Sequence, residues 1–102
     1  MKDNQALIVV DVQKDFLETG ALPVKDGSQV VPVINRISPK FKHVVFTQDW
    51  HPQGHISFAS SHLGKAPYST IDVSYGKQVL WPEHCVQNTV GAEFADGLNT
   101  EN

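Results

Sequence analysis

The chain has 102 residues, which is enough for one small domain and too few for two. Its net charge of -3, with Lys and Arg scattered, gives no electrostatic case for a nucleic acid or an anionic membrane as partner. The sequence has neither the roughly 20 apolar residues of a membrane-spanning helix nor the pattern of a signal peptide. Its single cysteine, Cys85, cannot form an internal disulfide. Together these features predict a cytoplasmic protein.

A continuous apolar run at residues 6–10, rich in β-branched side chains, predicts the first strand. Such a run is typical of a parallel strand that is covered on both faces. The run ends in Asp11, and ligands of open α/β sheets bind beyond the carboxyl ends of the strands. Asp11 is therefore a candidate functional residue, and a turn-forming or capping role is the alternative.

A helix and a second strand follow in the pattern of a parallel crossover. The helix is predicted from an N-cap at Ser28 to a point before Pro39, because apolar residues recur there at helical spacing. Residues 43–48 predict the second strand, and a strand–helix–strand connection in one sheet is almost always parallel and right-handed. Since parallel strands end on one edge, we expect Asp11 and Asp49 on the same rim of the sheet.

Side chains of the metal-ligand type gather in residues 47–58, directly behind the second strand. Asp49 and His51 are two positions apart, so both side chains leave the same face if the chain is extended there. A carboxylate oxygen and an imidazole nitrogen make half of a divalent metal site, and His84 can supply a third ligand. Three ligands leave positions open for water or substrate. From spacing alone, loop histidines without a metal remain the alternative.

The rest of the chain predicts less regular structure. Residues 59–77 are polar and lack a sustained period, which predicts an irregular excursion that is either functional or disordered. Residues 89–94 predict a single helical turn. Two strands and one helix cannot cover both faces of a parallel sheet, so the sequence has the content of about half an α/β domain.

Three ordered motifs carry a resemblance to a known family. They are Asp11-x-Gln13-x-Asp15-Phe16, then Thr47-x-Asp49-Trp50-His51-Pro52-x-x-His55-x-Ser57-Phe58, then Trp81-Pro82-x-His84-Cys85-Val86-Gln87-x-Thr89-x-Gly91-Ala92-x-Phe94. These motifs resemble those of bacterial nicotinamidases, which are metal-dependent members of the isochorismatase-like hydrolases. The resemblance extends from Ala6 to about Asn99 and therefore covers nearly the whole chain.

The resemblance implies an α/β protein with an isochorismatase-like three-layer α/β/α fold around a parallel sheet. Residues 1–102 would be the N-terminal part of a single domain of this kind. It also implies hydrolysis of nicotinamide, and of pyrazinamide, to the acid and ammonia, within NAD salvage. The implied partner is this small-molecule substrate, and the sequence leaves open a separate C-terminal fragment and a homo-oligomer.

The resemblance also assigns roles to particular residues of the metal site. Asp49, His51 and His84 match ligands of a divalent metal, and this donor set suits Zn, Mn or Fe. His55 matches a position that binds the metal in some members and only hydrogen-bonds around the ligands in others. We favour the second role for His55. Asp11 matches the catalytic acid/base.

Two aromatic residues and two polar residues complete the implied site. Phe16 and Trp81 match the walls of the pyridine pocket, where a flat ring can stack. Ordinary core packing is the alternative for both side chains. Gln13 and Asp15 are expected to be local hydrogen-bonding residues.

The sequence departs from the family pattern in its nucleophile. The family's nucleophilic cysteine and its lysine follow the last motif, beyond Asn102, so both are expected to be missing and the 102-residue chain alone is predicted to be inactive. Cys85 directly follows His84 and would point away from the metal in extended chain. We therefore predict that Cys85 is a small buried residue. The alternative functions are a non-catalytic metal-binding fragment and a related small-amide hydrolase.

Overall fold

The structure is a computed structural model that describes residues 2–101. Two of its strands pair in parallel and form a two-stranded sheet. The strands are β1 (Lys2–Val9) and β2 (Phe41–Phe46). The predicted parallel pairing is confirmed, although β2 begins and ends two residues earlier than predicted. Met1 and Asn102, the two ends of the expected N-terminal domain part, lie outside the described residues.

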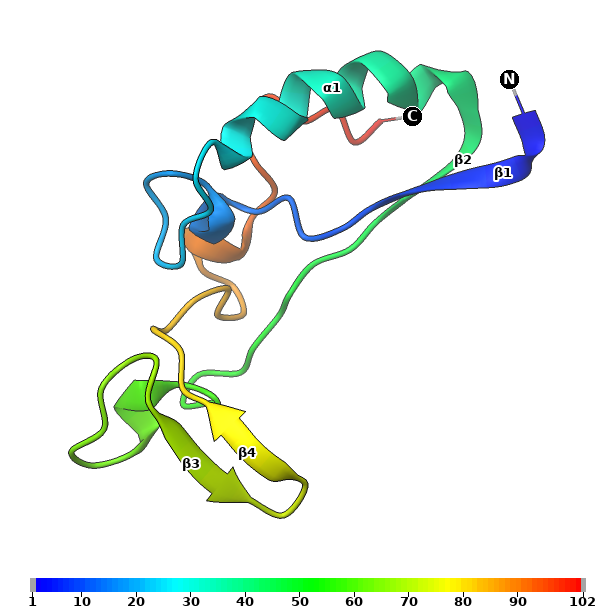
Figure 1. Cartoon of the computed structure of the whole chain (residues 1–102). Coiled ribbons are helices and arrows are strands. Elements are labelled where there is room, and N and C mark those ends of the chain that lie inside the picture. Colours follow the sequence, from blue (N-terminus) through cyan, green and yellow to red (C-terminus); the bar gives the residue numbers. More distant parts are fainter. Residues whose placement is uncertain (1, 102) are drawn as a thin grey trace.

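The predicted crossover helix is present as α1 (Val30–Ile37), and it lies along one side of the strand pair in Figure 1. The predicted N-cap at Ser28 is wrong. The chain is already helical at Gln29, because a 3-10 helix at Gly27–Gln29 leads directly into α1. The Ser28 hydroxyl instead donates a 2.6 Å hydrogen bond to Oε2 of Glu18, and this bond lowers the pKa of Glu18.

The apolar core lies between the helix and one face of the two strands. Val31 and Ile34 of α1 are buried against Val9, and this cluster is completed by Val12 and Ala95. Within residues 2–101, α1 covers one face of the strands only, as expected from the count of two strands and one helix. On the other face, apolar side chains are well exposed, at 61% for Ile8, 65% for Val10 and 50% for Val45. The described residues therefore form an incomplete α/β/α arrangement.

Residues 59–77 are more regular than the sequence predicted. A 3-10 helix at Ala59–Ser61 is followed by an antiparallel hairpin of β3 (Thr70–Val73) and β4 (Gly76–Val79). Both strands have four residues: Ile71 and Val73 alternate with polar residues in β3, but Val79 is the only apolar residue of β4, so the signal is weak. The prediction of an irregular excursion is therefore wrong for the hairpin. The single turn predicted at 89–94 is present as a 3-10 helix at Val90–Ala92.

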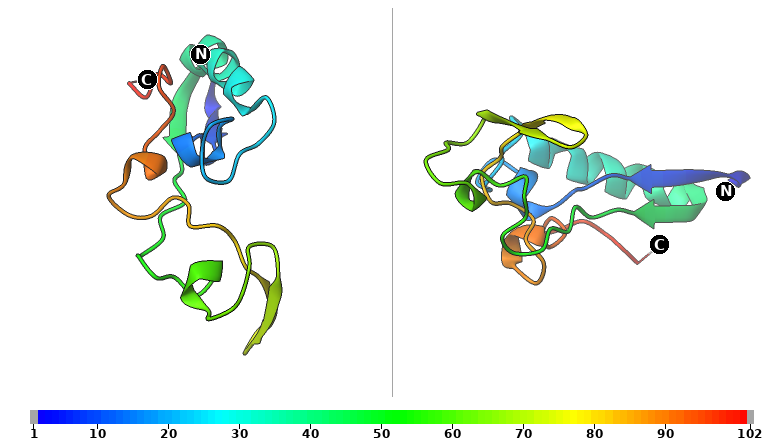
Figure 2. Two further views of the ribbon diagram at one scale, coloured as in Figure 1. Left: turned by 90° about the vertical axis from the view of Figure 1, so that its left-hand side faces the viewer. Right: turned by 90° about the horizontal axis from the view of Figure 1, so that it is seen from below.

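The hairpin lies at the opposite end of the molecule from the N-terminus, and two stretches of chain connect it to the strand–helix unit (Figures 1 and 2). The molecule measures 51 × 29 × 24 Å and has a radius of gyration of 16.2 Å. A compact domain of this length has a radius of gyration of about 13 Å. Within the described residues, no helix is long and apolar enough to cross a membrane.

Candidate active site

The two stretches that carry the candidate ligands run side by side. Two isolated parallel bridges join them, His51 with Val86 and Phe58 with Trp81. The backbone N–H of His51 donates to the carbonyl of Cys85 at 2.8 Å. Because His51 pairs directly beside Cys85 and Val86, the segment that follows β2 and the segment that follows β4 bring their histidines to one place.

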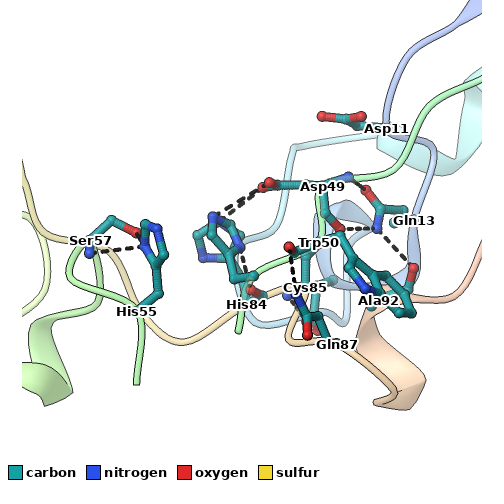
Figure 3. Close-up of polar contacts among 12 residues, drawn as sticks. Asp11, Gln13, Asp49, Trp50, His55, Ser57, His84, Cys85, Gln87 and Ala92 are labelled. Atoms are coloured by element: carbon teal, nitrogen blue, oxygen red, sulfur yellow. Dashed lines mark hydrogen bonds and ion pairs between the residues drawn. The ribbon is translucent and has the colours of Figure 1, made fainter. Parts of the chain in front are cut away.

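Asp49, His51 and His84 converge as the sequence predicted. Each offers one ligand atom, and these atoms all lie within 4.8 Å of one another. Nε2 of His51 is 3.4 Å from Oδ1 of Asp49, and Nε2 of His84 is 3.5 Å from Oδ2 of Asp49. The carboxylate of Asp49 faces His84 in Figure 3. The spacing and chemistry of these donors fit a divalent metal ion.

Hydrogen bonds on the far side of both imidazoles leave Nε2 available to a metal. Nδ1 of His51 is 3.1 Å from the carbonyl oxygen of His84, and Nδ1 of His84 is 2.7 Å from that of Pro82. A carbonyl oxygen only accepts, so Nδ1 carries the proton in each neutral ring. The lone pair of each ring then lies on Nε2, as in metal sites whose histidines are oriented by outer hydrogen bonds.

His55 lies beside the cluster and is in a different hydrogen-bonding state. The backbone N–H of Ser57 donates to Nδ1 of His55 at 3.1 Å, and the Ser57 hydroxyl lies 2.7 Å from the same atom. Because Nδ1 accepts, the neutral His55 ring carries its proton on Nε2. Its ring centroid is 4.9 Å from that of His51. His55 is therefore arranged as a hydrogen-bond donor next to the ligands.

Phe58 packs against all three imidazoles. Its side chain is fully buried, and its ring centroid lies 5.1 Å from His51, 5.6 Å from His84 and 5.9 Å from His55. Each contact is edge-on, a favourable arrangement for aromatic rings. A rigid apolar side chain thus limits the rotation of the candidate ligands.

Asp11 lies on the rim of the sheet next to the start of the second motif. Oγ1 of Thr47 donates to Oδ1 of Asp11 at 2.6 Å, and the Asp11 backbone N–H donates back to the same hydroxyl at 3.0 Å. The Asp11 backbone has a φ of 54°, in the left-handed region. Asp11 and Thr47 therefore lock the ends of the two strands together, and the expected common rim is confirmed.

Asp11 and Phe16 share a cavity of about 250 Å³, whose other walls are Val10, Val12, Leu17, Val24, Gly27 and Val30. The ring centroid of Phe16 is also 5.6 Å from that of His84, so Phe16 borders both the cavity and the ligand cluster. Trp81 does not line this cavity, and its ring packs edge-on against Tyr68 at 6.0 Å. A larger cavity of about 450 Å³ lies beside α1 and contains none of the predicted site residues.

Gln13 and Asp15 contribute more than the sequence predicted. The Gln13 side chain is fully buried and binds the backbone of Asp49 and Ala92, while Oδ2 of Asp15 accepts from the backbone N–H of Cys85 at 2.8 Å. The expectation of local hydrogen bonding is wrong for Gln13, whose partners are distant in sequence, and holds in part for Asp15, which also accepts from the nearby Ala21 N–H at 3.2 Å. The available signal was the series of polar side chains at positions 11, 13 and 15, directly after a buried strand.

Gly91 has no space for a side chain because the Asp15 carboxylate occupies it. A Cβ at Gly91 would collide with the carboxylate atoms of Asp15. The small residue of the third motif thus allows Asp15 to reach the backbone next to His84.

Cys85 is fully buried, as predicted. Burial raises the pKa of its thiol to about 12, and the negative charges of Asp49, Asp15 and Asp11 add to the effect. Its backbone has a φ of 48°, so the extended conformation assumed in the sequence argument is wrong although the conclusion holds. A neutral thiol of this kind is a poor nucleophile.

A family profile described as "Isochorismatase domain" matches residues 5–102. The chain belongs to this family. It is 55% identical over 97 residues to a nicotinamidase of Acinetobacter baylyi, an alignment that covers 95% of this chain and 45% of that protein. Both the predicted resemblance and the isochorismatase-like fold are thereby confirmed.

Solved structures of relatives share the arrangement of this isochorismatase-family chain. The nicotinamidase pyrazinamidase of Acinetobacter baumanii matches with a TM-score of 0.94 and 51% identity, over 99% of this chain and 49% of that one. The pyrazinamidase of Pyrococcus horikoshii, solved in complex with zinc, matches with a TM-score of 0.66 and 42% identity, over 94% of this chain and 47% of that one. The chain thus spans about half the length of the relatives it matches.

Proposed function

We propose that this chain supplies the metal centre and the acid/base of a nicotinamidase, which hydrolyses nicotinamide to nicotinate and ammonia. The observation that carries the proposal is the convergence of Asp49, His51 and His84, with both imidazoles held so that Nε2 is free. The nicotinamidase relatives supply the substrate class. We further propose that the reaction belongs to NAD salvage in the cytoplasm.

Asp49, His51 and His84 would hold a divalent metal, which supplies Lewis acidity toward a ring nitrogen of the substrate. One oxygen and two nitrogen donors suit Zn, Mn or Fe, and the zinc complex of the Pyrococcus horikoshii relative makes Zn the first metal to test. His55 would donate from Nε2 to groups bound next to these ligands.

Asp11 would transfer the proton. One of its carboxylate oxygens accepts from Thr47, and within residues 2–101 the other has no hydrogen-bond partner, so it is free to take a proton from the nucleophile. The same oxygen would return the proton to the departing ammonia. Phe16, in the same cavity, would stack against the flat ring of the substrate. Of the two proposed pocket walls Phe16 is the better supported, because Trp81 packs outside this cavity.

The attacking thiolate would come from outside residues 1–102. Cys85 is the single cysteine of the chain, and its thiol is buried and has a raised pKa. We therefore propose that the 102-residue chain alone does not hydrolyse nicotinamide, and that a segment carrying the family's cysteine and lysine completes the enzyme.

The proposal is tested by measuring nicotinate and ammonia formed from nicotinamide by the protein expressed from its complete gene. Activity is expected in the presence of Zn²⁺, with loss on chelation and a decrease of roughly 100-fold or more in kcat for Asp11→Asn, as for removal of a general base. Residues 1–102 alone should give no nicotinate. Nicotinate from that short chain would overturn the assignment and return Cys85 to consideration.

Two alternatives differ from the proposal in measurable ways. A non-catalytic metal-binding fragment is favoured by the complete ligand set next to an unreactive Cys85, and it predicts stoichiometric Zn²⁺ binding without turnover. A hydrolase of other small amides predicts equal activity on benzamide, which lacks a ring nitrogen. Preference for nicotinamide over benzamide would exclude this second alternative.

A further inference from the structure

We infer that Gln13 is a positioning residue that fixes Asp49 as a metal ligand and thereby sets the metal affinity of the site. The inference rests on the proposed function, since it concerns the same metal centre. Gln13 binds neither metal nor substrate in this scheme. It acts through the backbone of Asp49.

The Gln13 side chain holds both backbone polar groups of Asp49 at once. Its Oε1 accepts from the Asp49 N–H at 2.8 Å, and its Nε2 donates to the Asp49 carbonyl at 2.8 Å. The second hydrogen of Nε2 is directed to the carbonyl of Ala92, also at 2.8 Å. With 0% of the residue exposed, water does not compete for these bonds.

Asp49 needs such a partner because it lies beyond the end of the strand ladder. β2 ends at Phe46, and the last backbone bonds from this segment to the first strand involve Thr47. The Gln13 amide presents a donor and an acceptor to Asp49, as a neighbouring strand would. The Gln13 side chain therefore makes the pair of hydrogen bonds to Asp49 that a backbone residue of a neighbouring strand would make.

The base from which Gln13 reaches Asp49 is itself anchored. The Gln13 backbone forms an antiparallel bridge with Phe94. Backbone hydrogen bonds flank this bridge on both sides: the Lys14 N–H donates to the Glu93 carbonyl at 2.9 Å, and the Ala95 N–H donates to the Val12 carbonyl at 2.9 Å. Figure 3 shows Gln13 on the backbone side of Asp49 and His84 on its carboxylate side. The Gln13 side-chain amide thus fixes the position of the Asp49 carboxylate relative to the end of β1.

The chemistry at this position requires an amide. A Glu side chain would keep the acceptor for the Asp49 N–H but would face two carbonyl oxygens with acceptors only. A Leu side chain of similar size would remove the partner of the Asp49 N–H and of the Asp49 carbonyl, while the Ala92 carbonyl would keep only its bond from Gln48. Residues that orient metal ligands in this way typically change metal affinity 10- to 100-fold when they are mutated.

The test measures the Zn²⁺ dissociation constant by chelator competition in the protein expressed from its complete gene. Gln13→Leu is expected to weaken Zn²⁺ binding about 10- to 100-fold. The isosteric Gln13→Glu is expected to weaken it by a similar factor, and it serves as the test if Gln13→Leu does not fold. The absorption spectrum of bound Co²⁺, which reports ligand geometry, should change in both variants.

Two matched controls separate positioning from general stability. Gln48→Leu removes an exposed amide that donates to the same Ala92 carbonyl at 3.1 Å, and the Gln48 side chain forms no hydrogen bond with Asp49. Ile34→Ala opens the buried core next to α1 and lowers the melting temperature. Both controls should keep the Zn²⁺ affinity and the Co²⁺ spectrum of the wild type, measured well below their melting temperatures.

The outcomes of these Zn²⁺ measurements distinguish the role of Gln13 from the existence of the metal site. If the wild type binds Zn²⁺ and the folded Gln13 variants bind it equally well with the same Co²⁺ spectrum, the inference is overturned while the proposed metal site stands. The inference is equally overturned if Ile34→Ala weakens binding as much as Gln13→Leu. If the wild type binds no divalent metal, both the inference and the proposed function fail.

Discussion

The strand–helix unit and the ligand cluster are held together by different forces. Between β1, α1 and β2 the contacts are apolar, centred on Val9, Val31 and Ile34. Around the ligands, Gln13 and Asp15 bind backbone groups of the second and third motifs through directional hydrogen bonds. Apolar burial scales with area and carries little direction, whereas a hydrogen bond fixes both distance and angle.

This difference indicates that one region mainly stabilises the fold and the other mainly positions the candidate metal ligands. The core supplies most of the favourable free energy of folding, since the burial of apolar surface is the main driving force for folding in water. The polar contacts place a carboxylate and two imidazoles within reach of one ion. Mutations in the two regions should therefore separate into those that change stability alone and those that change metal binding.

The largest expected effect comes from removing a ligand. His84→Ala should abolish stoichiometric Zn²⁺ binding in the complete protein, because it takes one of only three donors away and leaves the opposing Asp49 charge less compensated. Calorimetric titration with Zn²⁺ would measure this loss. His43→Ala provides the control, because His43 lies exposed on β2. Unchanged binding in His84→Ala would break the assignment of the cluster.

The next effect concerns the reactivity of Cys85. With its pKa raised from 9.0 to about 12, the native thiol has a roughly 1000-fold lower thiolate fraction near neutral pH than the unfolded one. Alkylation by iodoacetamide, followed by mass spectrometry, should be slow in native protein and fast in guanidinium. Rapid native labelling would show that the site region is open and would contradict the burial.

The same pKa shift predicts the direction of a pH effect on folding. Because the pKa of Cys85 is higher in the folded chain than in the unfolded one, unfolding releases a proton at alkaline pH. The contribution of Cys85 to stability is therefore full below pH 9 and is lost as the pH rises toward 12. Cys85→Ala should reduce this alkaline loss in denaturant titrations.

The sequence predicted those parts of the site that depend on strand ends. An apolar run followed directly by Asp11, and a second one followed by Asp49 and His51, were sufficient to predict one rim and half of a metal site. Parallel topology converts these sequence positions into proximity. His84 was a candidate third ligand from its residue type, and the family resemblance assigned it this role, because the path from the hairpin back to the site has no strong periodic signal.

Other features could not be predicted because their signals are weak or non-local. The strands of the β3–β4 hairpin are only four residues long, and the apolar alternation is confined to Ile71 and Val73 of β3. The partners of Gln13 lie on segments far away in the sequence, and a polar residue does not indicate its partner. The uncovered face of β1 and β2 was anticipated from the element count alone.

A smaller effect is expected from Gly91→Ala, which tests the polar side of the comparison. The added methyl group would collide with the Asp15 carboxylate and displace it from the Cys85 N–H, at a cost of about 1–3 kcal/mol, as for other overpacked sites. Denaturant unfolding would measure the cost. It should be much smaller in an Asp15→Ala background, and additive costs in the double variant would exclude the proposed clash.

The smallest effect should come from Lys77→Ala in the hairpin, which contributes to neither region. Nζ of Lys77 lies 2.7 Å from Oδ1 of Asp72, but the two side chains are 73% and 82% exposed. Exposed ion pairs contribute about 0–1 kcal/mol and are screened by salt. The free energy of unfolding should therefore change by less than about 1 kcal/mol, and still less in high salt. A larger loss, or weaker Zn²⁺ binding, would show that the hairpin is coupled to the ligand cluster through Leu80 and Trp81.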